Sequence, residues 1–498
     1  MKKKSRLFSR LALPAILLLS AATSYAKVLN VCDDITDPLT LDPQKQFSGK
    51  NHTICQQIFE GLIRFDSDGK IEPALAVSWE RTDPLRVRFH LRKGVSFHNG
   101  EPFNSAAVKF SIERYLDPAT GFPARPFIAS IAGAEVVDPD TVDIITKYPD
   151  GILLNRLAGF VVIVPPDYIK EKGPEYFAAN PVGTGAFIFK EWKKGEKVAL
   201  SANPAYWMTG YPKVEGLVFN FIALDKQLTA LFSGAVDLIS HLPGPQTIKL
   251  MENPGTTVLK KASFYAVCAN FNLKSGPLSK LAVRKALNHA LNKQELIRYD
   301  LLGNGKPVAA FSVEGETGHN KALKPYKFDV KQAKDLLAGA GYHDGFTLKA
   351  LVKVTAERTA KIIVSELKNV GVTLEFKLVS DAESITEFSR GGYDMAIGDV
   401  PDPIAHMYFR PALLLYSRSP HCLGGSPEFD ALLDQLVGIL DPAEGVKAAE
   451  KVDKYVYDNA MGLFTYQYVS LYGANKDLRF TPYVSGMPFF YGTYFLGK

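Results

Sequence analysis

Residues that could act as nucleophiles, general bases or metal ligands are not arranged in a known catalytic spacing in this sequence. The sequence lacks the Gly-x-Ser-x-Gly, His-Glu-x-x-His and phosphate-cradling Gly-x-x-x-x-Gly-Lys-Ser/Thr motifs. Gly183-Thr-Gly185 has no third glycine to complete a dinucleotide-binding loop, and Gly303-Asn-Gly305-Lys306 is followed by Pro307 rather than Ser or Thr. The sequence therefore predicts a protein that is not an enzyme, with a secreted hydrolase as the alternative from another class.

Nine histidines are the remaining candidates for metal binding. His98 precedes the turn dipeptide Asn99-Gly100, which favours a structural role. His406 and His421 lie in the same part of the chain as a turn-rich segment around Asp399. An imidazole is the commonest metal ligand, but an isolated histidine in a loop is more often solvated or caps a turn. We therefore expect no resident metal and no cofactor.

The first 26 residues have the three parts of a signal peptide. A basic start is followed by an apolar run over 11–22 and by Ser24-Tyr25-Ala26, whose small residues suit a signal peptidase. The apolar run contains Pro14 and is too short to cross about 30 Å of hydrocarbon comfortably. We expect cleavage after Ala26 and export of the remaining chain. The basic residues of this segment are Lys2, Lys3, Lys4, Arg6 and Arg10.

Charge and cysteine content describe the exported part of the chain. The chain has 58 Lys and Arg and 52 Asp and Glu; five of the basic residues precede residue 27, so the remainder carries a net charge of +1. This balance gives no support for nucleic-acid binding.

Disulfides are possible in an exported protein, and four cysteines allow three complete pairings. One or two disulfides and buried thiols both stay open for Cys32, Cys55, Cys268 and Cys422.

The elements expected in the first half form a turn-rich α+β unit. Apolar residues at helical spacing predict a helix over 51–65 and another over 105–116, with Ser105 as the N-cap. Short strands are expected over 28–32, 86–92, 140–146, 216–222 and 236–239, and a short helix over 228–234.

The second half has the pattern of an α/β unit. Strands over 347–352 and 372–379 are separated by a helix over 356–370, which predicts a βαβ unit with parallel strands. A short strand over 393–397 leads into a turn over 398–403. Periodicity changes near a strand over 263–270, so we expect two lobes. Further helices are expected over 281–291, 332–340, 428–440 and 443–459.

Distinctive motifs occur in a fixed order along the chain. Glu72-Pro-Ala-Leu-Ala-Val-Ser-Trp79 is followed by Arg88-Phe-His-Leu-Arg-Lys-Gly-Val-Ser-Phe-His-Asn-Gly100. Asn180-Pro-Val-Gly-Thr-Gly-Ala-Phe187 and Asn203-Pro-Ala-Tyr-Trp207 come next. Together they resemble the family 5 extracellular solute-binding proteins, the periplasmic receptors of peptide and nickel ABC importers. The resemblance covers nearly all of 28–472.

The resemblance implies an α/β fold with mixed sheets, namely the two-lobed periplasmic-binding-protein fold. After the signal peptide (1–26), the first lobe would span 27–265 with an added subdomain at about 70–180. The second lobe would span 266–472, and 473–498 would return to the first lobe. Two crossing segments would join the lobes, and hinge closure would bury the ligand. The closed receptor would dock on ABC permease subunits in the inner membrane, and we expect it to be a monomer.

The resemblance also implies a peptide ligand, a di- or oligopeptide. Peptide-binding relatives hold the ligand's terminal ammonium with the first Asp of a D-x-x-D-P loop, which matches Asp399-Val-Pro-Asp402-Pro403. Asp399 would then make a charge-assisted contact with the ammonium. Asp402, which precedes Pro403, is expected to cap a turn.

Other ligand contacts are expected from positions that face the cleft in relatives. Arg358, at the start of the helix over 356–370, could hold a ligand carboxylate with two hydrogen bonds, or could be an ordinary surface charge. Tyr265, Phe271 and Tyr408 are candidate cleft aromatics, and a core role would explain each equally well.

The alternative ligand is nickel or a nickel chelate. His421, in Arg418-Ser-Pro-His421, stands about where nickel-binding relatives place a metal-contacting histidine. One histidine is an incomplete set of metal ligands, and a small polycarboxylate could supply the rest.

Overall fold

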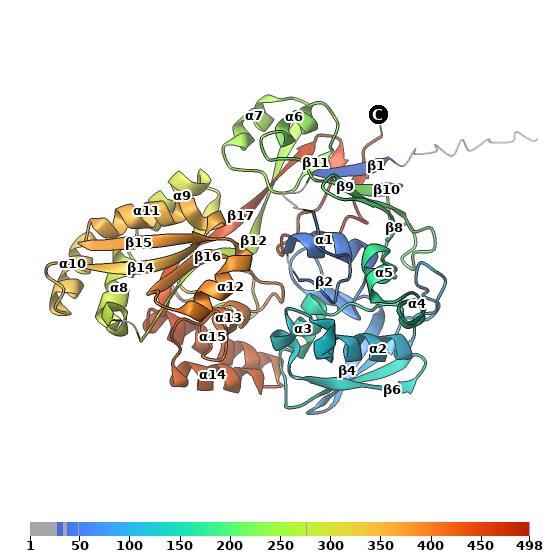
Figure 1. Cartoon of the computed structure of the whole chain (residues 1–498), viewed down its shortest axis with the longest axis horizontal. Coiled ribbons are helices and arrows are strands. Elements are labelled where there is room, and N and C mark those ends of the chain that lie inside the picture. Colours follow the sequence, from blue (N-terminus) through green and yellow to red (C-terminus); the bar gives the residue numbers. More distant parts are fainter. Residues whose placement is uncertain (1–26, 33–36, 48, 275, 498) are drawn as a thin grey trace, which may run out of the picture.

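The fold is described from a computed structural model that covers residues 27–32, 37–47, 49–274 and 276–497. The expected signal peptide over 1–26 lies outside the described residues. No helix among those residues is both long and apolar enough to cross a bilayer. Figure 1 shows two bodies side by side, joined by a pair of long strands.

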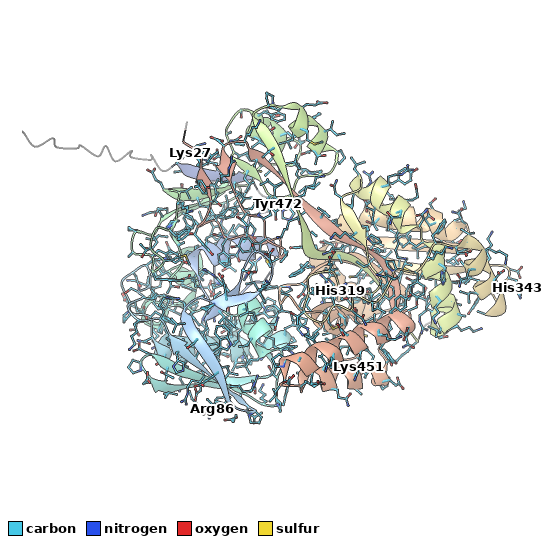
Figure 2. All side chains as sticks on the ribbon, turned by 180° about the vertical axis from the view of Figure 1, so that it is seen from behind. Lys27, Arg86, His319, His343, Lys451 and Tyr472 are labelled. Carbon is cyan, nitrogen blue, oxygen red and sulfur yellow. The ribbon has the colours of Figure 1, made fainter. Side chains whose placement is uncertain are left out.

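The joining strands are β12 (Thr256–Phe271) and β17 (Gly462–Asn475), which pair antiparallel with each other. Within the described residues they lie in the middle of an 11-stranded mixed sheet whose order is β15-β14-β16-β12-β17-β11-β1-β10-β9-β8. β13 (Gly305–Pro307) pairs with β17 outside this path. The lobe boundaries expected near 265 and 472 fall inside β12 and β17, and they stay a prediction. Figure 2 shows Tyr472 on β17 between the two bodies, with Arg86 and His343 at far corners of the molecule.

The first body contains the elements up to β11 and α7 (Figure 1). Its strands are β1 (Val28–Cys32), β2 (Ile63–Phe65), β3 (Ile71–Pro73), β4 (Ala76–Asp83), β5 (Arg86–Leu91), β6 (Ile131–Asp138), β7 (Thr141–Thr146), β8 (Phe187–Lys193), β9 (Lys197–Ala202), β10 (Gly216–Asn220) and β11 (Leu238–Ile239). Its helices are α1 (Gly49–Ile58), α2 (Ser105–Leu116), α3 (Leu153–Phe160), α4 (Pro166–Lys172), α5 (Pro174–Ala179), α6 (Gln227–Phe232) and α7 (Gln246–Glu252). β4, β5, β7 and β6 form a separate antiparallel sheet within the region expected as an added subdomain.

The second body places helices on both sides of the parallel strands (Figure 1). Its strands are β14 (Phe346–Lys353), β15 (Val372–Val379) and β16 (Met395–Pro401). Its helices are α8 (Leu281–Ala290), α9 (Lys293–Leu301), α10 (Val330–Gly339), α11 (Glu357–Lys368), α12 (Asp381–Arg390), α13 (Phe409–Leu414), α14 (Pro427–Val437) and α15 (Pro442–Asp458). The chain ends with β18 (Leu478–Arg479) and β19 (Tyr494–Phe495). Short 3-10 turns occupy Pro118–Thr120, Arg125–Ile128, Gly276–Ser279 and Val354–Ala356.

Two apolar clusters explain how the elements pack. One lies beneath the parallel strands and includes Leu287, Ile363 and Ile397 from α8, α11 and β16. The other combines side chains of both bodies, such as Phe160 of α3 with Met407 of the segment after β16. The two bodies are therefore in apolar contact in this structure.

The βαβ unit is confirmed: β14 and β15 pair parallel and α11 connects them. Two local expectations are wrong. The helix expected over 51–65 ends at Ile58, because the chain then turns into β2, which pairs with β3. Asn104, not Ser105, caps α2, since its side chain accepts from the main-chain N–H groups of Ala106 and Ala107. All four cysteines are thiols, three of them buried, which matches the buried-thiol alternative.

The turn expected from residue 398 is also corrected. β16 continues through 398–401, because these residues pair antiparallel with Tyr265–Cys268 of β12. Asp399 therefore lies on a strand opposite Val267 and not in a loop. The Gly-Asp and Val-Pro dipeptides favour a turn locally, but pairing with a long neighbouring strand outweighs that preference.

Candidate functional site

Asp399 is half-buried near the carboxyl end of β16, where the strand approaches the first body. Its carboxylate accepts a hydrogen bond from the Thr355 hydroxyl. The Lys353 ammonium lies 3.5 Å from the Asp399 main-chain oxygen. The ends of β14 and β16 thus bring one acidic and one basic side chain close together.

A cavity of about 150 Å³ lies beside these residues and has a largely apolar wall. Asp399 and His421, two residues expected to contact the ligand, both line it. Lys353 and Asn270 add polar groups to the same wall. The remaining lining residues come from β12, β14, β15, β16, α12 and α13, and include Leu351, Phe388, Ala396, Phe409 and Leu414.

His421 is held in this wall as a neutral ring. Burial lowers the pKa of the His421 imidazole, and the positive charge of Lys353 lowers it further. Its ring packs edge-on against Phe388, with centroids 5.3 Å apart. A neutral imidazole keeps a lone pair for a hydrogen bond or a metal.

The segment that follows β16 is fixed by buried charges. Asp402 accepts hydrogen bonds of 2.8 Å from the main-chain N–H groups of Ile404 and His406, which confirms its expected capping position. Burial and the Glu316 carboxylate raise the pKa of Asp402, while the Arg410 guanidinium acts in the opposite direction. Arg410 donates to Glu316, and both side chains are fully buried. Burial lowers the pKa of His406 to about 3, so this ring is neutral.

The other expected contacts lie apart from this cavity. Arg358 is exposed on α11 and forms an ion pair with Asp300, with Nε 3.6 Å from Oδ1. Phe271 is only 1% exposed, in the apolar cluster beneath the parallel strands, so we leave it out of the proposed site. Tyr265 is half-buried on β12 opposite Pro401. Tyr408 is half-buried at the start of α13, and its ring centroid lies 4.8 Å from the Arg156 guanidinium.

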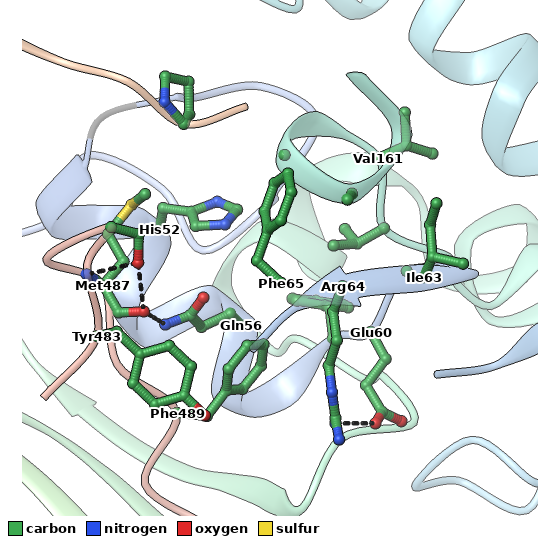
Figure 3. Close-up of a pocket in the computed structure, with 17 residues that line it drawn as sticks. His52, Gln56, Glu60, Ile63, Arg64, Phe65, Val161, Tyr483, Met487 and Phe489 are labelled. Atoms are coloured by element: carbon green, nitrogen blue, oxygen red, sulfur yellow. Dashed lines mark hydrogen bonds and ion pairs between the residues drawn. The ribbon is translucent and has the colours of Figure 1, made fainter. Parts of the chain in front are cut away.

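A second cavity, of about 40 Å³, lies where the two bodies and the C-terminal segment meet (Figure 3). His52 and Phe65 point into it in Figure 3, and Pro403 adds a wall from the segment after β16. Burial lowers the pKa of His52 to about 4. Gln56 closes one side by donating to the main-chain oxygens of Met487 and Pro488, each at 2.9 Å.

This second cavity could not be found from local sequence patterns, because its walls come from segments more than 400 residues apart. Arg64 lies beside it, with Nη1 3.8 Å from the Glu60 carboxylate (Figure 3).

No group of three or more His, Cys, Asp or Glu side chains suited to a metal ion occurs in the part of the chain that the structure describes. His421 is the one histidine among the described residues that line the cavity of about 150 Å³. The site holds hydrogen-bonding and charged groups around apolar walls, which suits binding of a small polar solute.

Comparison with known proteins identifies the family. The model of the family described as "Bacterial extracellular solute-binding proteins, family 5 Middle" matches residues 70–417. The chain belongs to this family. It is 28% identical over 463 residues to heme-binding protein A of Haemophilus influenzae, covering 85% of this chain and 84% of that protein. It is 26% identical over 359 residues to the glutathione-binding protein GsiB of Escherichia coli, covering 71% of this chain and 70% of that protein.

A solved structure agrees with the family and the fold. The ABC transporter-associated periplasmic binding protein DppA of Helicobacter pylori, in complex with the peptide STSA, superposes with a TM-score of 0.82 at 25% identity. The match covers 95% of this chain and 98% of that one. The two-lobed periplasmic-binding-protein fold expected from the sequence is therefore confirmed. The chain is a solute-binding protein of the ABC importer type and not an enzyme, as its relatives are binding proteins.

Proposed function

We propose that this family 5 receptor is a monomeric periplasmic protein that captures di- or oligopeptides and delivers them to ABC permease subunits. The observation that carries the proposal is Asp399, a half-buried carboxylate at the cavity beside the end of β16. A free peptide begins with an ammonium group, which a carboxylate binds most strongly where water is excluded. The peptide-bound relative DppA supports the same ligand class.

The surroundings of Asp399 suit this role. Thr355 donates to the carboxylate and orients it, and the remaining lone pairs can accept an ammonium. Lys353, on the same cavity wall, offers a positive charge to a carboxylate of the ligand. Apolar walls from β16 and α13 would cover a side chain or the peptide backbone.

Binding would occur between two lobes that close on the ligand. We propose a first lobe of 27–265 and 473–498, with its subdomain at about 70–180, and a second lobe of 266–472. The hinge would then be the central parts of β12 and β17, because these strands cross from one body to the other. The secreted form would start at Lys27, once the segment 1–26 has been removed.

Calorimetry on the variant Asp399→Asn tests the ammonium contact. Peptides with a free amine should bind about 2–5 kcal/mol more weakly to this variant, because a buried ammonium would lose its partner charge. N-acetylated peptides should bind poorly to the wild type and respond little to the substitution. Asp458→Asn, a change on the exposed face of α15, is the matched control and should leave the affinity unchanged.

A nickel chelate is the second candidate, because neutral His421 lines the same cavity as Asp399. Binding of a nickel–histidine complex should then fall in His421→Ala and barely change in Asp399→Asn. Glutathione and hemin, the ligands in the names of the two relatives, are tested in the same calorimetric experiment. Unchanged peptide affinity in Asp399→Asn together with loss of nickel-chelate binding in His421→Ala would replace the peptide proposal with the nickel one.

A further inference from the structure

Helix α3 of the first body lies directly against the segment that follows β16. The Asn155 side-chain amide donates to the Ile404 main-chain oxygen at 2.9 Å. The main-chain N–H of Gly151, just before α3, donates to the Val437 oxygen at the end of α14 at 2.8 Å. These hydrogen bonds join residues of the two proposed lobes outside the crossing strands β12 and β17.

Two glycines allow this approach. A β-carbon at Gly151 would lie 1.8 Å from the Ile439 main-chain oxygen, and one at Gly159 would lie 2.4 Å from the Pro403 main-chain oxygen. Neither residue has a positive φ, so the backbone conformation alone does not require glycine at either position. Close contact with the opposite lobe is the physical reason for the missing side chains.

Arg156 adds a third contact from the same helix. Its guanidinium is fixed within the first body by Asp150, with Nε 2.9 Å from Oδ2, and by the Phe127 main-chain oxygen at 2.6 Å. Held in this way, it faces the Tyr408 ring of the second body. A cation over an aromatic ring is stabilised by the ring's quadrupole, more so away from water.

The contacted segment is coupled to the proposed ligand site. It begins three residues after Asp399. Its first turn is held by the two hydrogen bonds that the Asp402 carboxylate accepts from main-chain N–H groups. Pro403 and Gly159 also share the wall of the cavity in Figure 3. The end of β16 therefore connects the proposed ligand site to the surface on which α3 rests.

We propose that Gly151 and the helix α3, which contains Gly159, form a closure latch that docks on 403–409 and on the end of α14 when ligand is bound. This inference rests on the proposed function, because it assigns the step that keeps the loaded receptor closed. The latch regulates affinity without touching the ligand: a receptor that cannot dock α3 binds its ligand to one lobe only.

The test uses full-length mature protein carrying Gly151→Ala and Gly159→Ala, with Gly133→Ala on β6 as the matched control. A β-carbon at Gly133 would meet no atom within 4 Å. Small-angle scattering and calorimetry are run with a tryptic digest of casein, glutathione, hemin and nickel–histidine. With the ligand that binds, the wild type and the control should become more compact. The double variant should stay extended and bind at least ten-fold more weakly, with its far-UV circular dichroism unchanged.

The outcomes separate the latch from the peptide proposal. Compaction of the wild type by nickel–histidine but not by peptides, with loss of compaction in the double variant, supports the latch and contradicts the peptide ligand. Equal compaction and affinity in the double variant would overturn the latch. Loss of native circular dichroism in the double variant would also overturn it, because the contact would then be a permanent part of the fold. The latch is equally refuted if no ligand of the panel compacts the wild type.

Discussion

Arg410 is a charged side chain only 1% exposed, held by an equally buried partner. It donates to Glu316 and to three main-chain oxygens, those of Phe264, Phe311 and Val400. Arg410→Met would leave the Glu316 carboxylate buried without its counter-charge. We expect the free energy of unfolding to fall by about 3–5 kcal/mol. Urea denaturation measures this difference.

The matched control for Arg410 is Arg418→Met. Arg418 pairs with Asp434 at 3.1 Å, but its side chain is 74% exposed. Exposed pairs contribute at most about 1 kcal/mol, so this variant should unfold nearly like the wild type. Similar losses in both variants would mean that burial of the Arg410 pair has no special importance for stability.

Asp453 gives the fold a specific dependence on pH. Burial raises its pKa to about 6, although Ser312 and the Asn320 main-chain N–H donate to one oxygen. Since the native pKa lies above the unfolded value of 3.8, the native state holds this proton more tightly. The stabilisation is present below about pH 4 and is lost as pH rises to about 6. Asp453→Asn should therefore gain stability relative to the wild type across this range, by up to about 3 kcal/mol.

Urea denaturation at several pH values between 4 and 7.5 measures the Asp453 effect. Asp458→Asn, on the same helix but exposed, is the control and should show a difference from the wild type that does not change with pH. A constant difference for Asp453→Asn as well would show that Asp453 is ionised in the native protein throughout.

At the scale of single elements, the start of α2 depends on Asn104. Its side chain accepts from Ala106 and Ala107 at 3.0 and 3.1 Å, whereas the Ser105 hydroxyl donates to the Asp138 main-chain oxygen at 2.6 Å. Asn104→Ala should lower the free energy of unfolding by about 1 kcal/mol, because two N–H groups lose their acceptor. Asn104→Ser should restore most of it. If Ser105→Ala lowered the free energy of unfolding more than Asn104→Ala does, Ser105 would be the N-cap of α2.

The elements show which patterns could be read from the sequence and which could not. The parallel pair β14 and β15 was predictable, because strand–helix–strand alternation is a local signal. The extent of β16 was not, because residues 398–401 look like a turn until β12, more than 100 residues away, pairs with them. Helix α1 was predicted too long because the residues after 62 form β2, which pairs with β3 in a hairpin. That pairing cannot be seen in the helical spacing of the apolar residues.

The candidate site could be predicted only in part. Family motifs pointed to Asp399 and His421, and both line one cavity. The motifs could not separate Phe271, which is packed in the core, from residues that face a cavity. The position of His52 and the two latch glycines could not be inferred at all, because each depends on contacts between distant parts of the chain.

At the scale of the whole molecule, ligand binding and stability are linked because the ligand binds the native state and not the unfolded chain. At a free ligand concentration 100 times the dissociation constant, the wild type should gain about 2.7 kcal/mol of stability. If Asp399→Asn raises the dissociation constant about 100-fold, the same concentration should add only about 0.4 kcal/mol. Urea denaturation of both proteins, with and without a free-amine peptide, measures the two gains. An equal gain in the variant would show that the peptide binds without the Asp399 carboxylate.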